Sequence, residues 1–407
     1  MPPKFGQLVI GPPGSGKSTY CDGMHQFLSA VGRPCSIVNL DPANDHTSYK
    51  PALDVRSLVS LEQIMTDEDL GPNGSVLHAL ETIEADFDWL EDGLATLDND
   101  YILFDCPGQV ELFTHHESLR NIIGKLAKKL DYRLVVMHLV DSFVLTRPSL
   151  YISALLLSLR TMLQLDMPHI NVLSKIDNLH NYPRLPFDLE FYTEVHDLQY
   201  LLPLLNAEQT GKTLPSRPSD DDPTRPATLP ELDEDEGEED VEPSKFDALN
   251  AAIVNLVEDF SLVGYEPLVV EDKASMAALL HAADKASGYA FGAEGGANDT
   301  IWQVAVRSGA TSMDVRDVQE RWIDRRVEYD AAEREAWAKE GEEWNRGEDG
   351  QGAGGEENVP VGGGEGDEMD LDVDFGKELE GLRRGMKGFD SGVKIVRKKP
   401  GQGGSGG

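Results

Sequence analysis

Cysteine and basic residues are scarce in this chain of 407 residues. The three cysteines, Cys21, Cys35 and Cys106, are too few for a disulfide framework and lack the paired spacing of a zinc site, so we expect buried free thiols in a reducing compartment. Lysine and arginine number 36 against 73 aspartate and glutamate residues, which gives a net charge of −37. This charge argues against direct binding of nucleic acid or anionic lipid and favours protein partners and small phosphate ligands.

Long apolar runs are also missing. No uninterrupted apolar stretch reaches the length of a membrane-spanning helix, and the first residues do not have the apolar stretch and cleavage site of a secretory signal. We therefore expect a cytoplasmic protein without membrane contact. The hydrophobic residues, 40% of the chain, gather in its first two thirds, which predicts one large domain with disordered extensions.

Short apolar runs alternate with helical patterns in this first part. The runs end in glycine, aspartate or proline, as in a parallel sheet whose strands are joined by crossover helices. The expected strands cover residues 7–10, 35–40, 101–104, 134–140, 169–173 and 268–270. The expected helices cover residues 17–31, 75–94, 149–165, 246–260 and 273–286. The predicted fold class is α/β, with a mostly parallel sheet flanked by helices.

The first expected strand runs directly into a glycine-rich motif. Residues 11–18 read Gly-Pro-Pro-Gly-Ser-Gly-Lys-Ser, which satisfies the phosphate-loop pattern G-x-x-x-x-G-K-[ST] between a strand and a helix. Glycines let backbone N–H groups curl around phosphates, and the helix N-terminus adds partial positive charge. We expect Lys17 to reach the β- and γ-phosphates and Ser18 to bind Mg²⁺. The residues expected to bind the nucleotide here are Gly14, Ser15, Gly16, Lys17, Ser18 and Thr19.

A second apolar strand ends in Asp105 and is followed by Cys-Pro-Gly-Gln. An aspartate at the carboxyl end of a sheet strand points at the phosphate crevice, so we expect Asp105 to hold Mg²⁺ together with Ser18. We expect Gly108 to present its backbone N–H to the γ-phosphate and Gln109 to orient the attacking water. An Asp-x-x-Gly segment alone is also a common turn, but its pairing with a phosphate loop favours the functional interpretation.

The segment Ser174-Lys175-Ile176-Asp177 follows the apolar run at 169–173 and favours guanine as the base. A carboxylate accepts two N–H bonds from the guanine edge, which adenine does not supply, and a lysine stem lies along the ring plane. The usual first residue of this signature is asparagine or threonine, so Ser174 departs from the pattern. A surface turn containing lysine and aspartate is the alternative.

Two segments between these motifs carry further candidates. Asp41 ends the second expected strand, where we expect its carboxylate to contact the nucleophilic water or a water on Mg²⁺. Helix capping or a turn is the alternative for Asp41. Gly71-Pro72-Asn73 precedes a long amphipathic helix, and by itself it indicates a turn and a helix cap.

These motifs predict a P-loop GTPase domain over residues 1–290. Residues 207–244 within it are rich in aspartate and glutamate and predict an acidic disordered insertion. Residues 291–407 form a C-terminal extension with one expected helix, at 314–337, in an otherwise disordered sequence rich in glycine and acidic residues. Basic residues between 383 and 399 are either a nuclear-import or docking patch or, more simply, part of a solvated tail.

Taken together, the motifs resemble those of the GPN-loop GTPase family, most of all its second eukaryotic paralogue. The resemblance extends from Lys4 to about Ala286. It carries Gly-Pro-Pro-Gly-Ser-Gly-Lys-Ser-Thr, Leu-Asp-Pro-Ala, Gly-Pro-Asn-Gly, Asp-Cys-Pro-Gly-Gln-Val-Glu-Leu and Ser-Lys-Ile-Asp in the family's order. It further implies that Leu262 and Val263, within Asp-Phe-Ser-Leu-Val, contact the base.

The resemblance also implies a dimer, either a homodimer or a heterodimer with a paralogous GPN-loop GTPase. The loop Gly71-Pro72-Asn73 of one subunit would reach the active site of the other, where Asn73 stabilises the transferred phosphoryl group. A role in the assembly and nuclear import of RNA polymerases II and III is implied as well. The protein would then be cytoplasmic and shuttle to the nucleus.

The expected reaction is in-line attack of water on the γ-phosphate of GTP, with Mg²⁺ as cofactor. Asp41 and Gln109 place the water, while Lys17 and Asn73 balance the developing charge. Slow turnover is expected until a partner orders the site, as in a switch or assembly factor. One alternative is a P-loop kinase, against which stand Ser-Lys-Ile-Asp and the absence of an arginine-rich lid. The other is a scaffold that binds nucleotide without cleaving it.

Overall fold

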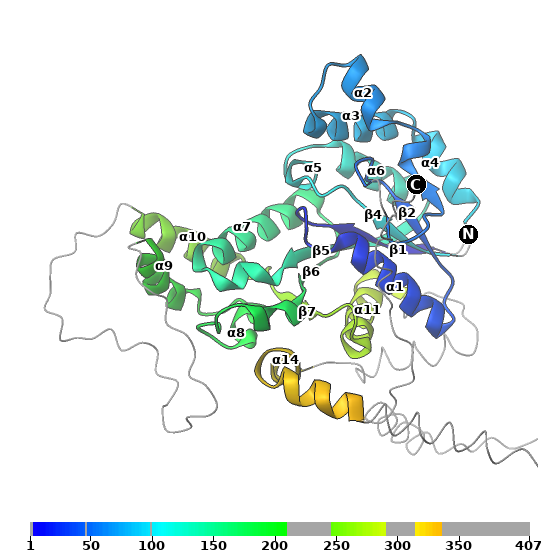
Figure 1. Cartoon of the computed structure of the whole chain (residues 1–407). Coiled ribbons are helices and arrows are strands. Elements are labelled where there is room, and N and C mark those ends of the chain that lie inside the picture. Colours follow the sequence, from blue (N-terminus) through cyan, green and yellow to red (C-terminus); the bar gives the residue numbers. More distant parts are fainter. Residues whose placement is uncertain (1–2, 45–46, 98–99, 210–245, 290–313, 336–407) are drawn as a thin grey trace, which may run out of the picture. The chain divides into compact units, whose positions relative to one another are not determined.

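The computed structural model describes residues 3–44, 47–97, 100–209, 246–289 and 314–335 (Figure 1). The described residues up to Arg325 belong to one compact unit, and residues 326–335, which are helical, belong to a second. The sheet and the candidate site both belong to the first unit. Nearly all of the acidic insertion and most of the C-terminal extension, including the basic residues between 383 and 399, lie outside the described residues.

A seven-stranded sheet in the order β3-β2-β4-β1-β5-β6-β7 forms the centre of the first unit. Every neighbouring pair of strands in it is parallel, which confirms the α/β fold predicted from the apolar runs. The strands are β1 Lys4–Ile10, β2 Cys35–Asn39, β3 Leu53–Asp54, β4 Tyr101–Asp105, β5 Tyr132–Asp141, β6 His169–Ser174 and β7 Tyr265–Leu268. The strands differ from the prediction in several bounds. β3 was not expected, β1 begins at Lys4 rather than 7, and the last strand covers Tyr265–Leu268 rather than 268–270.

Helices lie in every connection between successive strands except that between β2 and β3, which is irregular in its described residues. The α-helices are α1 Lys17–Val31, α2 Leu61–Asp67, α3 Pro72–Ala85, α4 Phe87–Ala95, α5 Val110–Thr114, α6 Ser118–Lys129, α7 Pro148–Leu165, α8 Leu189–Glu194, α9 Leu201–Gln209, α10 Asp247–Phe260, α11 Lys273–Ser287 and α14 Val315–Gln319. Short 3₁₀ turns cover Val55–Ser57, Ser142–Thr146, Ile176–Asn181 and Leu198–Tyr200, and a π-helical turn covers Glu320–Asp324. The single helix expected over 75–94 is divided into α3 and α4 at Asp86, whose ψ of 55° leaves the helical region.

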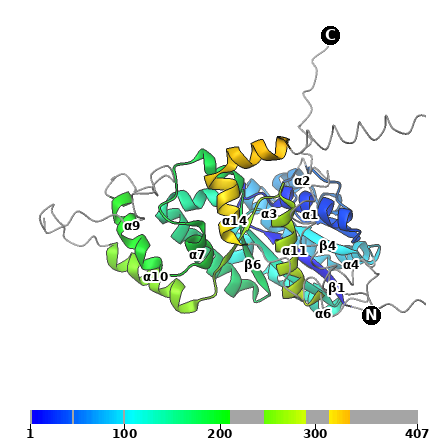
Figure 2. The ribbon, with the colours of Figure 1, turned by 90° about the horizontal axis from the view of Figure 1, so that it is seen from below.

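Alternating side chains of the strands face two helical layers. Leu8 and Ile10 of β1 pack in one apolar cluster with α3, α4 and α6, while Val9 packs in another with α1 and α11. Figures 1 and 2 show α1 and α11 on the same side of the sheet. A third cluster joins α7, α8, α9 and α10 to β6 and β7.

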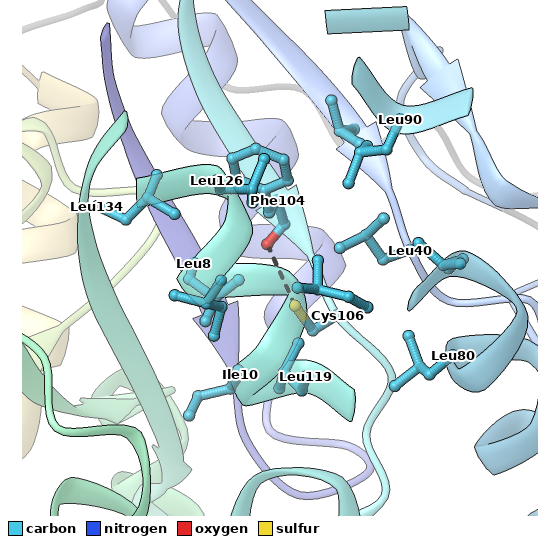
Figure 3. Packing of buried hydrophobic residues seen from close by; sticks show 14 of the residues in the cluster. Leu8, Ile10, Leu40, Leu80, Leu90, Phe104, Cys106, Leu119, Leu126 and Leu134 are labelled. Carbon is cyan, nitrogen blue, oxygen red and sulfur yellow. Dashed lines mark hydrogen bonds between the residues drawn. The ribbon is translucent and has the colours of Figure 1, made fainter. Parts of the chain in front are cut away.

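Figure 3 shows the first cluster, in which Leu8, Ile10 and Phe104 of the sheet meet leucines of the covering helices. Leu80 and Leu126 are fully buried there. Burial of each such leucine contributes about 1.5–3 kcal/mol to folding, so the helical layers fix the sheet beneath the site.

All three cysteines are free, and Cys21 and Cys106 are buried as expected, whereas Cys35 is only partly buried. Within the part of the chain that the structure describes, no helix combines the length and the apolar character needed to cross a bilayer.

Candidate active site

The phosphate loop follows β1 and leads into α1. Gly14 and Gly16 adopt left-handed φ angles of 81° and 91°, which favour glycine. A Cβ on Gly11 would lie 2.2 Å from the carbonyl oxygen of Leu139 on β5, so this loop passes too close to the sheet for a side chain. The resulting turn places the N-terminus of α1, with its free backbone N–H groups, beside the loop.

Lys17 lies where the loop meets the segment after β4. Its Nζ donates hydrogen bonds to the carbonyls of Gly11, at 3.1 Å, and Pro12, at 3.3 Å. A Cβ on Gly108 would lie 2.8 Å from the same Nζ, so the backbone of Gly108 passes directly against it. Burial lowers the pKa of Lys17, and the nearby carboxylate of Asp105 works in the opposite direction. The lysine and Gly108 therefore share one small region, as the motifs predict.

Ser18 and Asp105, the two residues expected to hold Mg²⁺, are hydrogen-bonded to each other. The Ser18 hydroxyl donates to Asp105 Oδ2 at 2.7 Å, and the Tyr49 hydroxyl donates to the same oxygen at 2.6 Å. Asp105 is 1% exposed. Burial raises its pKa, while the hydrogen bonds from Tyr49 and Ser18 and the charge of Lys17 lower it.

The other oxygen of Asp105, Oδ1, is buried and has no hydrogen-bond partner. Together with Ser18 Oγ it offers the hard oxygen donors that Mg²⁺ prefers. The described residues contain no cluster of three or more histidine, cysteine or acidic side chains fit for a metal. Magnesium is usually held by one or two protein ligands together with phosphate and water. The residues present thus fit the ion.

The end of β6 and the residue that follows it contact the phosphate loop through two side chains. The Ser174 hydroxyl donates to the carbonyl of Ser15 at 2.7 Å, so the serine that departs from the usual signature still joins the two motifs. Lys175, in a left-handed conformation with φ of 60°, donates to the carbonyl of Gly14 and to Asp141 Oδ2, the latter at 2.6 Å. Ile176 is fully buried. A pocket beside this segment is lined by Gly16, Thr19, Ser174, Lys175, Asp177, Val269, Val270 and Glu271.

Leu262 and Val263, which we expect from the resemblance to contact the base, do not line this pocket. Leu262 is 49% exposed, and Val263 packs in the apolar cluster beside α8 and α10. Both precede β7, whereas Leu268 at the carboxyl end of β7 pairs with Ser174. Because the strands are parallel, residues before β7 lie at the sheet edge opposite to Asp177. Val269 and Val270, which directly follow β7, line the pocket instead.

Asp41 follows β2 and makes a turn. Its Oδ1 accepts from the backbone N–H of Ala43 at 2.9 Å, and its own N–H donates to Asn39 Oδ1 at 3.1 Å. Its charge also acts on Lys17 and Asp105, which places the carboxylate near the phosphate loop. The turn alternative is therefore present in the structure, and the catalytic role of Asp41 stays a prediction.

The loop Gly71-Pro72-Asn73 begins α3. Gly71 is the residue before the first turn and Pro72 opens the helix, a position suited to its fixed φ. Asn73 is thus not the capping residue. Its Oδ1 accepts a hydrogen bond of 3.3 Å from Gln109 Nε2 of the same chain. The structure therefore brings together two side chains that the sequence assigned separately to catalysis.

Known proteins resemble this chain over the region that contains these motifs. Residues 9–289 match the profile of a family described as "Conserved hypothetical ATP binding protein". GPN-loop GTPase 2 of Schizosaccharomyces pombe is 48% identical over 81% of this chain and 94% of its own length. The chain belongs to the GPN-loop GTPase family. GPN-loop GTPase 2 of Saccharomyces cerevisiae is 46% identical over 81% of this chain and 88% of its own length. That of Danio rerio is 43% identical over 79% and 93%.

A solved structure of a GTPase in apo form from Pyrococcus abyssi is also similar to this GPN-loop GTPase. It covers 69% of this chain and 97% of its own, with 22% identity and a TM-score of 0.49.

Several residues of this GPN-loop GTPase site were missed from the sequence. Asp141 ends the apolar strand β5, the same signal that led to Asp105, and it could have been found. Ser142 donates to the carbonyl of Lys175 at 2.9 Å, and Asn44 donates to Ser18 Oγ at 3.0 Å. Neither has a sequence signal of its own. Tyr49 has none either, because the segment Thr-Ser-Tyr-Lys carries no recognisable pattern.

Proposed function

We propose that this GPN-loop GTPase binds GTP together with Mg²⁺ and hydrolyses the γ-phosphate by in-line attack of water. The observation that carries the proposal is the convergence of three motifs on one loop. Ser18 of the loop bonds to Asp105, Gly108 lies against Lys17, and Ser174 and Lys175 bond to the loop carbonyls. Such a reaction needs positioning and charge neutralisation more than covalent chemistry.

Each residue has a defined task in this proposal. Ser18 and Asp105 hold the ion, which supplies charge neutralisation at the phosphate oxygens when bound. Lys17 balances the charge that develops on the transferred group, and Gly108 offers its backbone N–H beside Lys17. Asp41 and Gln109 place the attacking water. The hydrogen bond from Gln109 to Asn73 supports a joint role of these two side chains.

The base is selected at the pocket beside Asp177. Its carboxylate accepts two N–H groups from guanine, a pair that adenine does not present, so GTP is favoured although the matching family profile is described as ATP-binding. Lys175 is held by Asp141 and the Gly14 carbonyl, which keeps its stem over the loop.

The cellular role is proposed from family resemblance. The protein would act as a dimeric switch or assembly factor, a homodimer or a heterodimer with a paralogous GPN-loop GTPase, in the assembly and nuclear localisation of RNA polymerases II and III. The net charge of −37 supports protein partners over nucleic acid.

Phosphate release from the purified full chain tests the proposal. GTP with Mg²⁺ should release phosphate, ATP should do so far more slowly, and Lys17→Ala should abolish the release. Tight GTP binding without phosphate release, with or without a paralogous partner, would favour a scaffold. Transfer of the γ-phosphate to a nucleoside monophosphate in place of water would favour a kinase.

A further inference from the structure

The buried phenol of Tyr49 makes a contact that none of the motifs accounts for. Its hydroxyl donates to Asp105 Oδ2 at 2.6 Å. Tyr49 is 7% exposed and Asp105 is 1% exposed, so water is largely excluded from this bond. A hydrogen bond to a buried carboxylate is among the stronger kinds in proteins.

Two donors converge on one oxygen of this carboxylate. Ser18 Oγ bonds to the same Oδ2 at 2.7 Å, whereas Oδ1 is buried without a partner. Two hydrogen bonds to Oδ2 oppose rotation of the carboxylate about its Cβ–Cγ bond. They leave Oδ1 as the oxygen available to a ligand. Ser18 alone would give one donor, and the carboxylate would then exchange its two oxygens more readily.

The ring of Tyr49 is itself held firmly. It belongs to the apolar cluster that contains Tyr20 and Ile37, beneath α1. The Thr47 hydroxyl donates to the carbonyl of Tyr49 at 2.8 Å, and the N–H of Ala52 donates to the carbonyl of Ile37 at 2.8 Å. A side chain fixed by packing and by its own backbone is suited to orient a neighbour.

The segment that carries Tyr49 also reaches the other expected ligand. Asn44 Nδ2 donates to Ser18 Oγ at 3.0 Å, and Arg56 in turn donates to the carbonyl of Asn44 at 2.9 Å. The chain between β2 and β3 thus contacts both Ser18 and Asp105.

We propose that Tyr49 is a positioning residue of the magnesium site. Its phenol fixes the orientation of the Asp105 carboxylate, so that Oδ1 faces the hydrated ion while Oδ2 stays bonded to Ser18. Tyr49 itself touches neither the ion nor the nucleotide. The inference rests on the proposed function, since it assigns a residue to the ion that accompanies GTP. Groups that orient metal ligands typically change metal affinity about 10–100-fold when they are removed.

The test measures how nucleotide binding by the full chain depends on Mg²⁺. A fluorescent, non-hydrolysable GTP analogue is titrated at a series of MgCl₂ concentrations and in EDTA. For Tyr49→Phe we expect the MgCl₂ concentration at half-maximal binding to rise about tenfold. Affinity in EDTA should stay within about twofold of the wild type, since the phosphate loop and the base pocket are unchanged.

Tyr151→Phe is the matched control. This phenol is also fully buried and donates a hydrogen bond of 2.8 Å, but its acceptor is the backbone carbonyl of Tyr192, between α7 and α8. Tyr151→Phe should lower the melting temperature without moving the MgCl₂ midpoint.

A double-mutant cycle shows whether Tyr49 acts through Asp105. Added to Asp105→Asn, Tyr49→Phe should cause little further change in the MgCl₂ midpoint. A Tyr49→Phe protein that is only less stable, with the wild-type midpoint, would overturn the inference, as would an undiminished shift in the Asp105→Asn background. If the wild type bound the analogue equally well in MgCl₂ and in EDTA, the proposed magnesium site would fail first and the role of Tyr49 with it.

Discussion

Lys17 and Asp105 are both buried. Burial lowers the pKa of Lys17 and raises that of Asp105, so in both cases it favours the neutral form. A fold gains little from charges placed in this way, because each one loses its hydration. Their hydrogen bonds and mutual attraction offset part of that loss. Two buried charges that stabilise the fold so little are better understood as parts of a binding site.

Replacement of Lys17 separates binding from folding. We expect Lys17→Ala to lose GTP affinity by about a hundredfold or more, because the charge beside the loop is removed. Its stability should change by less than about 1 kcal/mol, since burial already opposes the charged form and only two bonds to loop carbonyls are lost. Analogue binding and urea unfolding, followed in parallel, check both. Unchanged GTP affinity in a folded variant would contradict the site assignment.

Substitution of Asp177 should change the base preference of the site from guanine to xanthine. In Asp177→Asn one acceptor becomes an amide donor, which repels the guanine N–H pair but suits xanthine, whose C2 carries a carbonyl oxygen. We expect GTP affinity to fall about a hundredfold and XTP affinity to rise. Competition of GTP, XTP and ATP against a fluorescent analogue measures the change. The prediction fails if GTP still outcompetes XTP.

Some residues of the site could be predicted from the sequence, and others could not. Asp105, Lys17 and Asp177 were found because each lies at a fixed place after a strand, where the chain alone sets the geometry. Tyr49 and Asn44 come from an irregular connection, and their contacts with Asp105 and Ser18 arise only when β2 and β4 pair. Leu262 and Val263 were named from the family resemblance, and both precede β7, at the sheet edge opposite to the pocket beside Asp177.

At the level of elements, α1 and α11 are joined by one buried ion pair. Arg33, after α1, donates to both oxygens of Asp284 on α11, at 3.0 and 2.9 Å. The guanidinium lies 4.0 Å from the ring centroid of Tyr101 and 3.7 Å from that of Tyr289. Asp284 is fully buried and Arg33 is 8% exposed. This arrangement holds α11 against the face of the sheet that α1 also covers.

Removal of the carboxylate should therefore destabilise the fold strongly. Asp284→Ala leaves a buried arginine without its counter-charge, and we expect a loss of about 3–5 kcal/mol in the free energy of unfolding. Glu190→Gln is the control, because its partner Arg316 is 74% exposed and a pair of this kind contributes less than about 1 kcal/mol. Urea unfolding of both variants checks the contrast. Equal losses of stability in the two variants would show that burial does not determine how much an ion pair contributes to stability.

Two histidines lie at β5 and β6. His138 is fully buried, and His169 is half-buried with both of its ring nitrogens shielded from solvent. Burial lowers the pKa of His138 to about 4 and that of His169 to about 3, from an ordinary value of 6.5. Both folded pKa values are depressed, so the folded state binds fewer protons than the unfolded state below pH 6.5. Their contribution to stability is complete above the unfolded pKa and is lost as pH falls.

We expect each histidine to lower the free energy of unfolding by about 1 kcal/mol between pH 7 and pH 5.5. His138→Asn should reduce this pH-dependent loss by about 1 kcal/mol, whatever its effect at pH 7. Unfolding curves at the two pH values give the difference. An unchanged pH dependence would mean that His138 is accessible to protons in the folded state.

The parallel strands other than β3 were predicted because each contains a short apolar run that is largely buried. The break between α3 and α4 was not, since Asp86 sits within an unbroken helical repeat of apolar residues. The two-residue strand β3 is too short for any periodicity. The local sequence pattern thus predicted the layers of the fold. The ends of the helices and strands depend on tertiary packing and could not be predicted from it.

For the whole molecule, the open question is whether Asn73 serves its own subunit or a partner. Within one chain it bonds to Gln109, which supports action in cis, whereas family resemblance implies action across a dimer. The two cases predict different behaviour of mixed dimers. Asn73→Ala alone should bind GTP nearly as well as the wild type and hydrolyse it about a hundredfold more slowly, because one stabilising contact is lost.

If Asn73 acts across a dimer, as family resemblance implies, mixing Asn73→Ala with Lys17→Ala should restore activity. The Asn73→Ala subunit keeps an intact phosphate loop and receives Asn73 from its partner, so each mixed dimer has one complete site. With equal amounts and free exchange, half of the dimers are mixed, and activity should reach about a quarter of the wild-type value per subunit. Phosphate release after subunit exchange measures this, with each variant alone as the baseline. No regain in a mixture shown to contain mixed dimers would place Asn73 in its own subunit's site, beside Gln109.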